Sequence, residues 1–174
     1  RLLKEVCELF PSGRFHIGGD EAPKNEWEAC PDCRRRMEEE HLLTSDDLQG
    51  YFSKRISVIL KKYGKVPVCW DDTLISDIRP DEMSVQYWNI QRAKLLKDFS
   101  DKGKFIYSDM FELYLDYPHS MIPLRKVYGS RPKIGKKDYS GCASFRGMEA
   151  CLWSEHIESD GELEKHIFPR IYAL

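Results

Sequence analysis

Five short apolar segments recur along the chain, and a turn or a polar loop follows each of them. They are rich in Val, Ile and aromatic residues and are bounded by Gly, Pro or charged residues, which is typical of buried β-strands. The third segment comes after a turn that we expect over residues 79–82. The predicted strands cover residues 14–19, 65–70, 83–89, 104–109 and 147–153.

Longer segments between the predicted strands have the spacing of amphipathic helices. In residues 45–64, we expect Ser45 to be the N-cap and Gly64 to end the helix. Residues 90–103 repeat this plan and also end at a glycine, and residues 2–10 read as a further helix. The apolar residues that share one face of the first of these helices are Leu48, Phe52, Ile56, Ile59 and Leu60.

Strands that alternate with helices are typical of a parallel sheet with crossover helices, so the predicted class is α/β. The segment from Tyr114 to Arg146 breaks this rhythm, because it is long and contains three prolines, at 118, 123 and 132. We expect helical pieces there at most. Long loops after the strands of such proteins are places where functional sites are built.

Acidic and tryptophan residues follow all five predicted strands. The carboxyl ends of parallel strands meet at one edge of a sheet, which is where active sites of α/β proteins lie. A solvated loop would explain one such residue but explains five consecutive cases poorly, so the pattern favours a shared site. The residues are Asp20, Glu21, Asp71, Asp72, Trp88, Asn89, Asp109, Trp153 and Glu155.

Asp20 and Glu21 are adjacent, and adjacent side chains of a strand point to opposite faces. They can share a pocket only if the strand has already ended, and Gly18 and Gly19 permit such a turn. Two close carboxylates separate their pKa values, which suits one general acid and one charged partner. The alternative is an N-cap Asp and a first-turn Glu at the start of a helix.

Tryptophan points to a class of ligand. Flat indole rings suit the apolar faces of sugars, and carboxylates suit sugar hydroxyls. Trp70, Trp88 and Trp153 each close an apolar segment, so we expect them to line a pocket, with burial in the core as the alternative. Trp27 lies in a helical segment, where packing is the expected role.

The composition excludes some classes of protein. The 174 residues carry a formal net charge of −2, which gives no indication of a nucleic-acid partner. No run of eighteen apolar residues is present, so we expect no membrane span. Cys69 and Cys151 lie in strand-like segments as small hydrophobes, which favours a reducing, cytoplasmic location.

Cys30 and Cys33 have the Cys-x-x-Cys spacing of zinc and redox sites. A zinc site needs two more ligands, and only Cys7 and His41 lie near in the sequence. A redox pair would sit directly after a strand, at a helix N-terminus. We therefore expect a local structural role, neither metal nor cofactor, and keep a metal or redox module as the weaker alternative.

Several motifs together resemble glycoside hydrolase family 20, the β-N-acetylhexosaminidases. They occur in the family's order and spacing, from about Arg14 to the end of the chain. The motifs are HIGGDE (16–21), KVPVCWDD (65–72), SVQYWN (84–89), LYLDY (113–117) and GMEACLWSEHI (147–157).

The resemblance implies a TIM barrel whose catalysis is assisted by the substrate. The 2-acetamido oxygen of the sugar attacks the anomeric carbon and forms an oxazolinium intermediate, so the enzyme supplies no nucleophile. Glu21 would be the general acid and then the base. Asp20 would accept the acetamido N–H, and Tyr114 would donate its hydroxyl to the acetamido oxygen.

The remaining site residues implied by the resemblance bind the sugar. Trp70, Trp88 and Trp153 would wall the acetamide and the sugar face. Asp116 and Glu155 would hydrogen-bond the 4- and 6-hydroxyls, and His16 would support the site from behind. The expected partner is a glycan or glycoconjugate that ends in N-acetylhexosamine.

Two positions depart from the family pattern. Asp71 stands where a longer Glu or Gln is common, so contacts there are expected to shift. Ser154 replaces a usual glycine, which is a mild change.

The five predicted strands resemble strands four to eight of the eight-stranded barrel, so residues 1–174 are expected to be a single domain that is part of a catalytic barrel. A part-barrel exposes two strand edges. We expect the fragment alone to be inactive or weak, and unstable unless it self-associates through those edges. The alternatives are a catalytically inactive sugar-binding fragment and a disaccharide-releasing relative.

Overall fold

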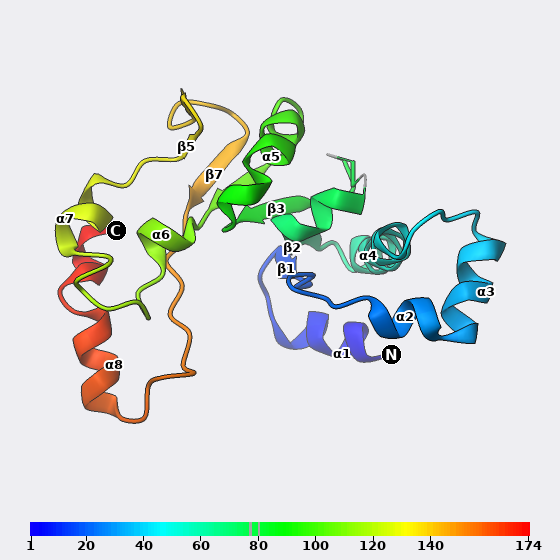
Figure 1. The fold of residues 1–174 in the computed structure, drawn as a ribbon, viewed down its shortest axis with the longest axis horizontal. Helices are drawn as coiled ribbons and strands as arrows, with labels where there is room; N and C mark the ends of the chain where they lie inside the picture. Colours follow the sequence, from blue (N-terminus) through cyan, green and yellow to red (C-terminus); the bar gives the residue numbers. More distant parts are fainter. Residues whose placement is uncertain (77, 80) are drawn as a thin grey trace.

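The computed structural model describes every residue of the chain except Asp77 and Pro80. Pro80 belongs to the turn expected over residues 79–82, so part of that turn lies outside the described residues. Figure 1 shows a central sheet, with α1 to α4 gathered at one end and α6 to α8 at the other. No helix in the described part of the chain is both long and apolar enough to span a bilayer.

The sheet contains the five predicted strands, and all neighbouring pairs are parallel. Their spatial order follows the sequence, β1-β2-β3-β4-β7, which confirms the α/β class. The strands are β1 (Arg14–His16), β2 (Val66–Trp70), β3 (Ser84–Tyr87), β4 (Phe105–Tyr107) and β7 (Phe145–Met148).

All five strands differ from their predicted bounds, and β1 and β7 differ most at their ends. β1 ends at His16, because Gly18 and Gly19 turn the chain with positive φ angles. β7 begins at Phe145 and ends at Met148, so the ACLW segment lies beyond the strand. A single parallel bridge pairs Tyr114 with Cys151 in that segment.

Eight α-helices and three short 3₁₀ segments are found among the described residues. The longest, α4, crosses from β1 to β2, and α5 crosses from β3 to β4, as predicted. The α-helices are α1 (Leu2–Leu9), α2 (Asn25–Ala29), α3 (Pro31–Glu39), α4 (Ser45–Lys62), α5 (Ala93–Ser100), α6 (Met110–Leu113), α7 (Leu124–Gly129) and α8 (Asp160–Ile167). The 3₁₀ segments are η1 (Asp71–Ser76), η2 (Ile90–Arg92) and η3 (Arg170–Ala173).

The cap of α4 was predicted one residue too late. Thr44 is the N-cap: its hydroxyl accepts from the Asp47 backbone N–H at 3.1 Å, and the Asp47 carboxylate accepts from the Thr44 N–H at 2.9 Å. This reciprocal pair is a capping box. Ser45 is already helical, and its hydroxyl donates to Glu28 at 3.0 Å. Gly64 follows the last turn with φ 69°, as expected for the residue that ends a helix.

The buried face of α4 includes only two of the five residues of the predicted apolar face, Leu48 and Leu60. The helix approaches η1 closely: a Cβ atom on Gly50 would lie 2.6 Å from the Cβ of Ser76. Only small residues fit there, so Ser53 and Ser57 are buried while Phe52 is 60% exposed. Phe52, Ile56 and Ile59 instead line an open groove of about 750 Å³ together with Ile17 and Trp27, which we call the α4 groove.

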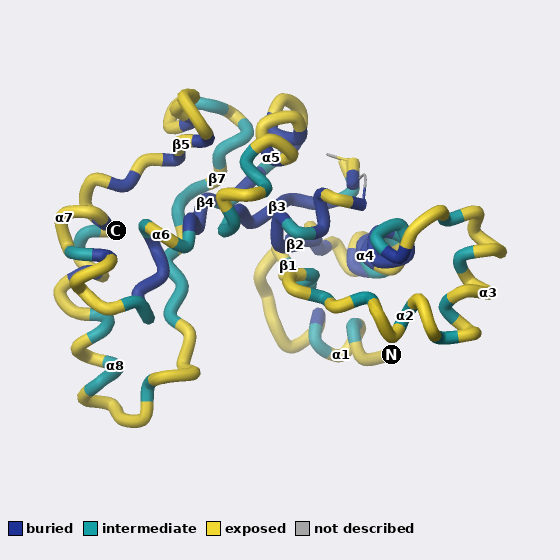
Figure 2. The backbone as a smooth tube through the Cα atoms, in the orientation of Figure 1, coloured by how far each residue is buried: buried dark blue, intermediate teal, exposed yellow. Residues whose placement is uncertain are grey.

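The hydrophobic core lies around the central strands, which are the darkest part of Figure 2. Val85, Tyr87, Phe105 and Tyr107 from β3 and β4 are at most 1% exposed. Cys69 is fully buried as predicted. Cys151 is only partly buried, because it lies beyond the end of β7.

The segment between Tyr114 and Arg146 holds more structure than the helical pieces that we expected. It contains α7 and also a two-stranded antiparallel hairpin, β5 (Lys133–Ile134) and β6 (Lys137–Asp138). Gly135 supplies the positive φ of the turn. Tyr139, after the hairpin, is buried edge-on against Phe105 with ring centroids 5.3 Å apart, which ties the loop to the sheet.

Candidate active site

The acid pair lies in a tight turn just after β1. Gly18 and Gly19 have φ angles of 72° and 104°, and Glu21 has φ 45°, a left-handed conformation that is rare for a residue with a side chain. Such conformations cost about 1–3 kcal/mol and cluster at functional sites. No helix begins at the pair, since α2 starts at Asn25, so the N-cap alternative is wrong.

The turn is held against the 3₁₀ segment η1 and the helix α4. A Cβ atom on Gly19 would lie 2.7 Å from the Oγ1 atom of Thr73, so only glycine fits. The Nε2 group of Gln49, from α4, donates to the Gly19 carbonyl oxygen at 2.7 Å. These contacts fix the backbone from which both carboxylates project.

A cavity of about 650 Å³ lies at the carboxyl ends of the strands. Eight of the nine predicted site residues line it, so the structure brings together side chains that are far apart in the sequence. Those eight are Asp20, Glu21, Trp70, Trp88, Tyr114, Asp116, Trp153 and Glu155.

Aromatic rings form a continuous wall in this cavity. The indole of Trp88 lies nearly parallel to the ring of Tyr114, with an interplanar angle of 17° and centroids 6.3 Å apart. Trp153 lies 6.0 Å from Tyr114 and 6.2 Å from Trp70. Trp70 is 8% exposed, so it belongs both to the core and to the cavity.

Tyr114 and Asp116 lie on the segment after α6. Burial raises the pKa of the Tyr114 hydroxyl well above its ordinary value, so this group remains a hydrogen-bond donor at neutral pH. The Oδ1 atom of Asp116 is buried and has no hydrogen-bond partner among the described residues. A buried carboxylate oxygen without a partner is costly, and a polar ligand group would satisfy it.

The fully buried Arg170 fixes this segment from behind. Its guanidinium donates to the carbonyl oxygens of Leu115 at 2.6 Å, Tyr117 at 2.8 Å and Ile122 at 3.0 Å. Two of these carbonyls flank Asp116. No pattern in the sequence indicated this role, because Arg170 lies 48 to 55 residues from the carbonyl groups that it binds.

His16 does not line the cavity. Its ring packs against Trp70 with centroids 4.9 Å apart, and its Nδ1 atom accepts from the Gly18 N–H at 3.0 Å. Partial burial lowers the pKa of His16, while the nearby Glu149 and Asp20 oppose that shift. His16 therefore contacts the turn and the aromatic wall, and the supporting role expected for it stays a prediction.

Three acids that follow strands do not line the cavity. Asp109 is the N-cap of α6, and its Oδ1 atom accepts from the Phe111 N–H at 2.9 Å. Asp71 accepts from the backbone N–H groups of Trp88 and Asn89. Neither it nor Asp72 lines the cavity. The acids at the strand ends therefore located the edge of the sheet where the cavity lies. Some of those acids bind backbone N–H groups and do not line the cavity.

Five further residues line the cavity without having been predicted. Tyr117 lies within the LYLDY motif, and His156 is next to Glu155, so both motifs carried a signal for them. His166 comes from α8, and no spacing in the sequence pointed to it. The five are Met110, Tyr117, Pro118, His156 and His166.

The Cys-x-x-Cys motif is remote from this cavity. Cys30 is the N-cap of α3, Pro31 is its first residue and Cys33 lies in the first turn. The motif is thus at a helix N-terminus, as in redox proteins, but it follows the helix α2 rather than a strand. The described residues contain no cluster of three or more His, Cys, Asp or Glu side chains able to hold a metal ion.

Comparison with known proteins gives consistent relatives. The chain is 29% identical to a β-hexosaminidase of Porphyromonas gingivalis over 99% of its own length and 24% of that protein. It is 27% identical to a β-hexosaminidase of Vibrio furnissii, of which it covers 30%. The chain therefore spans about a quarter to a third of the length of these relatives.

Solved structures agree with this similarity. The β-N-acetylhexosaminidase of Bacteroides fragilis superposes with a TM-score of 0.82 at 33% identity, over 98% of this chain and 37% of that one. A chitobiase of Flavobacterium johnsoniae gives a TM-score of 0.82 at 30% identity, over 99% of this chain and 26% of that one. The five-stranded sheet is accordingly part of a TIM barrel, as predicted.

The whole sequence, residues 1–174, matches the catalytic domain of glycosyl hydrolase family 20. The acid pair, the aromatic wall and the strand order agree with that match. The chain belongs to glycosyl hydrolase family 20.

Proposed function

We propose that this chain carries the acid pair and the aromatic wall of an exo-acting, retaining β-N-acetylhexosaminidase. The enzyme would remove terminal β-linked N-acetylglucosamine or N-acetylgalactosamine from a glycan or glycoconjugate. The observation that carries the proposal is the common cavity of about 650 Å³ that Asp20, Glu21 and Tyr114 share with three tryptophans.

Glu21 is the proposed proton donor. It protonates the leaving glycosidic oxygen in the first step, and in the second it accepts a proton from the water that opens the oxazolinium intermediate. Its backbone is fixed in the left-handed conformation, so its side chain shares the cavity with that of its neighbour. That arrangement lets adjacent acids act on adjacent atoms of one sugar.

Asp20 and Tyr114 act on the acetamido group, which is the nucleophile. Asp20 accepts the acetamido N–H, orients the group and stabilises the positive charge that develops on it. Tyr114 donates its hydroxyl to the acetamido oxygen, and the raised pKa of this hydroxyl keeps the proton available. These two contacts hold the acetamido oxygen beneath the anomeric carbon, which lowers the entropic barrier to attack.

The remaining contacts select the sugar. Trp70, Trp88 and Trp153 enclose the acetamido methyl group and one face of the ring. Asp116, with its unpartnered buried oxygen, and Glu155 accept hydrogen bonds from the 4- and 6-hydroxyls.

The test uses the full-length protein and two aryl glycosides, the β-N-acetylglucosaminide and the matching β-glucoside. We expect cleavage of the acetamido sugar alone, because the glucoside lacks the nucleophile. Glu21→Gln keeps the size of the side chain but cannot donate the proton, so activity should fall by at least about 100-fold.

Three other results of this assay would each contradict the proposal and indicate a different kind of activity. Cleavage of both sugars at similar rates would contradict assistance by the substrate. A folded protein that binds N-acetylglucosamine and cleaves neither sugar would be a sugar-binding relative. Release of a disaccharide from a longer aryl chitooligosaccharide would identify a disaccharide-releasing relative.

We also propose that the isolated 174-residue chain self-associates through the β1 edge and the α4 groove. β1 is an edge strand of the sheet, and Phe52, which lines the α4 groove, is 60% exposed. Open edges and apolar patches of this kind promote association. Light scattering should give a mass above that of one chain, and Phe52→Ser should lower it. A monomer at all concentrations would contradict this proposal.

A further inference from the structure

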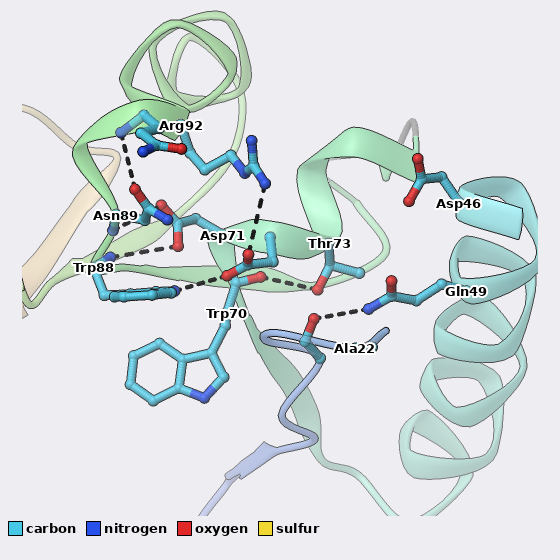
Figure 3. A network of polar contacts seen from close by, with 12 residues as sticks. Ala22, Asp46, Gln49, Trp70, Asp71, Thr73, Trp88, Asn89 and Arg92 are labelled. Atoms are coloured by element: carbon cyan, nitrogen blue, oxygen red, sulfur yellow. Dashed lines mark hydrogen bonds and ion pairs between the residues drawn. The ribbon is translucent and has the colours of Figure 1, made fainter. Parts of the chain in front are cut away.

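The two acids that follow Trp70 contact the same neighbouring residue, Trp88, in two different places. Asp71 and Asp72 open the 3₁₀ segment η1, in which successive side chains project about a third of a turn apart. One carboxylate therefore reaches the backbone of Trp88 and the other reaches its ring. Figure 3 shows Trp88, Asn89 and Arg92 facing the turn after Trp70.

The backbone of Trp88 is held on both sides. Its N–H donates to Asp71 Oδ1 at 3.5 Å, and the following N–H, of Asn89, donates to Asp71 Oδ2 at 3.2 Å. Its carbonyl oxygen accepts from the Met110 N–H at 3.1 Å. These bonds fix the backbone of Trp88 but do not fix the rotation of its indole ring about the side-chain torsions.

The ring is fixed by Asp72. The indole Nε1–H of Trp88 donates to Asp72 Oδ2 at 2.7 Å, the short distance expected for a charged acceptor. An indole has a single donor, so this bond sets the rotation of the ring. The same ring lies nearly parallel to Tyr114, at an angle of 17°, on the wall of the cavity.

The carboxylate is itself held by Arg92. An Nη atom of Arg92 lies 3.8 Å from Asp72 Oδ1, so the two oxygens of Asp72 face different partners. The side chains of Asp72 and Arg92 are only 14% and 27% exposed, which screens this ion pair less than a surface pair. Arg92 forms no other ion pair within the described residues.

We propose that Asp72 and Arg92 are positioning residues, which fix the indole of Trp88 in the wall of the substrate cavity. The inference deepens the proposed function and rests on it for the identity of the ligand. Neither Asp72 nor Arg92 lines the cavity, so both act through Trp88. A loosened indole would leave the acetamido group poorly enclosed and poorly aligned.

The kinetic test uses variants of the full-length protein on the aryl β-N-acetylglucosaminide. Asp72→Ala removes the acceptor and should lower kcat/KM about 10-fold to 100-fold, because small misplacements around a reacting group are costly. Asp72→Asn keeps an oxygen that accepts the indole N–H. Its fold-loss in kcat/KM should therefore be less than about one third of the fold-loss caused by Asp72→Ala. Asp101→Ala is the matched control, because the Asp101 side chain is 72% exposed, and it should leave kcat/KM unchanged.

Trp88→Phe separates positioning from a general effect on the protein. Phenylalanine keeps an aromatic face but has no N–H, so Asp72 has nothing to hold. Adding Asp72→Ala to Trp88→Phe should therefore cost little more than Trp88→Phe alone. If the two losses multiply, Asp72 does not act through the indole and the proposal is overturned.

A spectroscopic readout keeps the inference independent of activity. With 5-fluorotryptophan incorporated, the ¹⁹F resonance that disappears in Trp88→Phe belongs to Trp88. We expect Asp72→Ala and Arg92→Met to shift or broaden that resonance, and Asp72→Asn to leave it nearly unchanged. An unchanged Trp88 resonance in Asp72→Ala would overturn the proposal. If the unmodified protein cleaves neither aryl glycoside, the proposed function fails, while this measurement still decides whether Asp72 positions Trp88.

Discussion

Gly19 packs directly against Thr73, so that a Cβ atom added to Gly19 would lie 2.7 Å from the Thr73 Oγ1 atom. Thr73 cannot move away easily, because it is fully buried and its hydroxyl donates to the Trp70 carbonyl oxygen at 2.9 Å. The turn that carries the acid pair therefore packs directly against η1, the segment that follows β2. A shift of that turn would move both carboxylates together.

Gly19→Ala should displace the carboxylates of Asp20 and Glu21, although neither acid is itself substituted. The new methyl group meets Thr73, and the φ of 104° is unfavourable for alanine, so we expect a loss of about 1–3 kcal/mol in stability. The displaced carboxylates should lower kcat/KM at least about 100-fold. Kinetics and thermal unfolding of the full-length protein measure both effects. Gly13→Ala, where a Cβ atom would meet nothing within 4 Å, is the control; equal behaviour of the two variants would contradict the argument.

Removing the guanidinium of Arg170 should be among the most destabilising changes in this chain. Arg170→Met leaves the buried carbonyl oxygens of Leu115, Tyr117 and Ile122 without their donor. Each unsatisfied buried group costs about 1–3 kcal/mol, and partial relaxation should leave a net loss of about 3–5 kcal/mol. Urea denaturation gives the value. Arg35→Met, which breaks only exposed ion pairs, should cost less than about 1 kcal/mol.

The hydroxyl of Tyr114 should matter for the chemical step. Tyr114→Phe preserves the stacking on Trp88 but removes the proposed donor to the acetamido oxygen. We expect kcat to fall about 10-fold to 100-fold with a smaller change in KM, since the bond strengthens as charge develops. Steady-state kinetics on the aryl β-N-acetylglucosaminide measures this. Tyr128→Phe, at a ring that is 74% exposed, should leave both constants unchanged. A Tyr114→Phe enzyme with normal kcat would remove Tyr114 from the mechanism.

Asp71 should make the protein less stable as the pH rises. Burial, the largest cause, raises the pKa of Asp71 to about 8 from 3.8, and Asp72 adds to the shift while hydrogen bonds from Asn89 and Trp88 oppose it. Between about pH 4 and 8 the folded state then binds one proton more than the unfolded state. The free energy of unfolding therefore falls as the pH rises, with a slope of up to about 1.4 kcal/mol per pH unit.

Asp71→Asn removes this titration while it keeps an acceptor for one backbone N–H. Urea denaturation at pH 5 and at pH 7.5 should show a larger loss of stability for the unmodified protein than for Asp71→Asn. Other titrating groups are common to both proteins and cancel in the comparison. Parallel pH profiles would mean that Asp71 is ionised throughout this range.

Gly103, where the helix was predicted to end, lies three residues beyond the end of α5 and packs against it. A Cβ atom at Gly103 would lie 2.1 Å from the Phe99 ring, which is buried in the core. We expect Gly103→Ala to lower the melting temperature by several degrees, equivalent to about 1–3 kcal/mol. Gly129→Ala, within α7 and without any atom within 4 Å of the added Cβ, should be neutral or slightly stabilising. A neutral Gly103→Ala would mean that Phe99 can turn away at no cost.

Local signals determined the elements and the edge at which the site lies. Short apolar runs ending in Gly, Asp or Trp gave all five strands, because strand burial and turn formation depend on nearby residues. The glycine turn of HIGGDE located Asp20 and Glu21 locally, whereas Tyr114 and Asp116 came only from the resemblance of LYLDY to the family motif. The helix end at Gly64 was equally local.

Only the tertiary structure decided which polar residues face the cavity. Asp20 and Asp71 look alike in the sequence, yet one projects into the cavity and the other binds the backbone of the next strand. The face of α4 that is buried was set by its close approach to η1, which admits serine and glycine but not Phe52. His166 and Arg170 reach the site from the last helices of the chain. Contacts of this kind join residues tens of positions apart, and no periodicity or spacing within one segment encodes them.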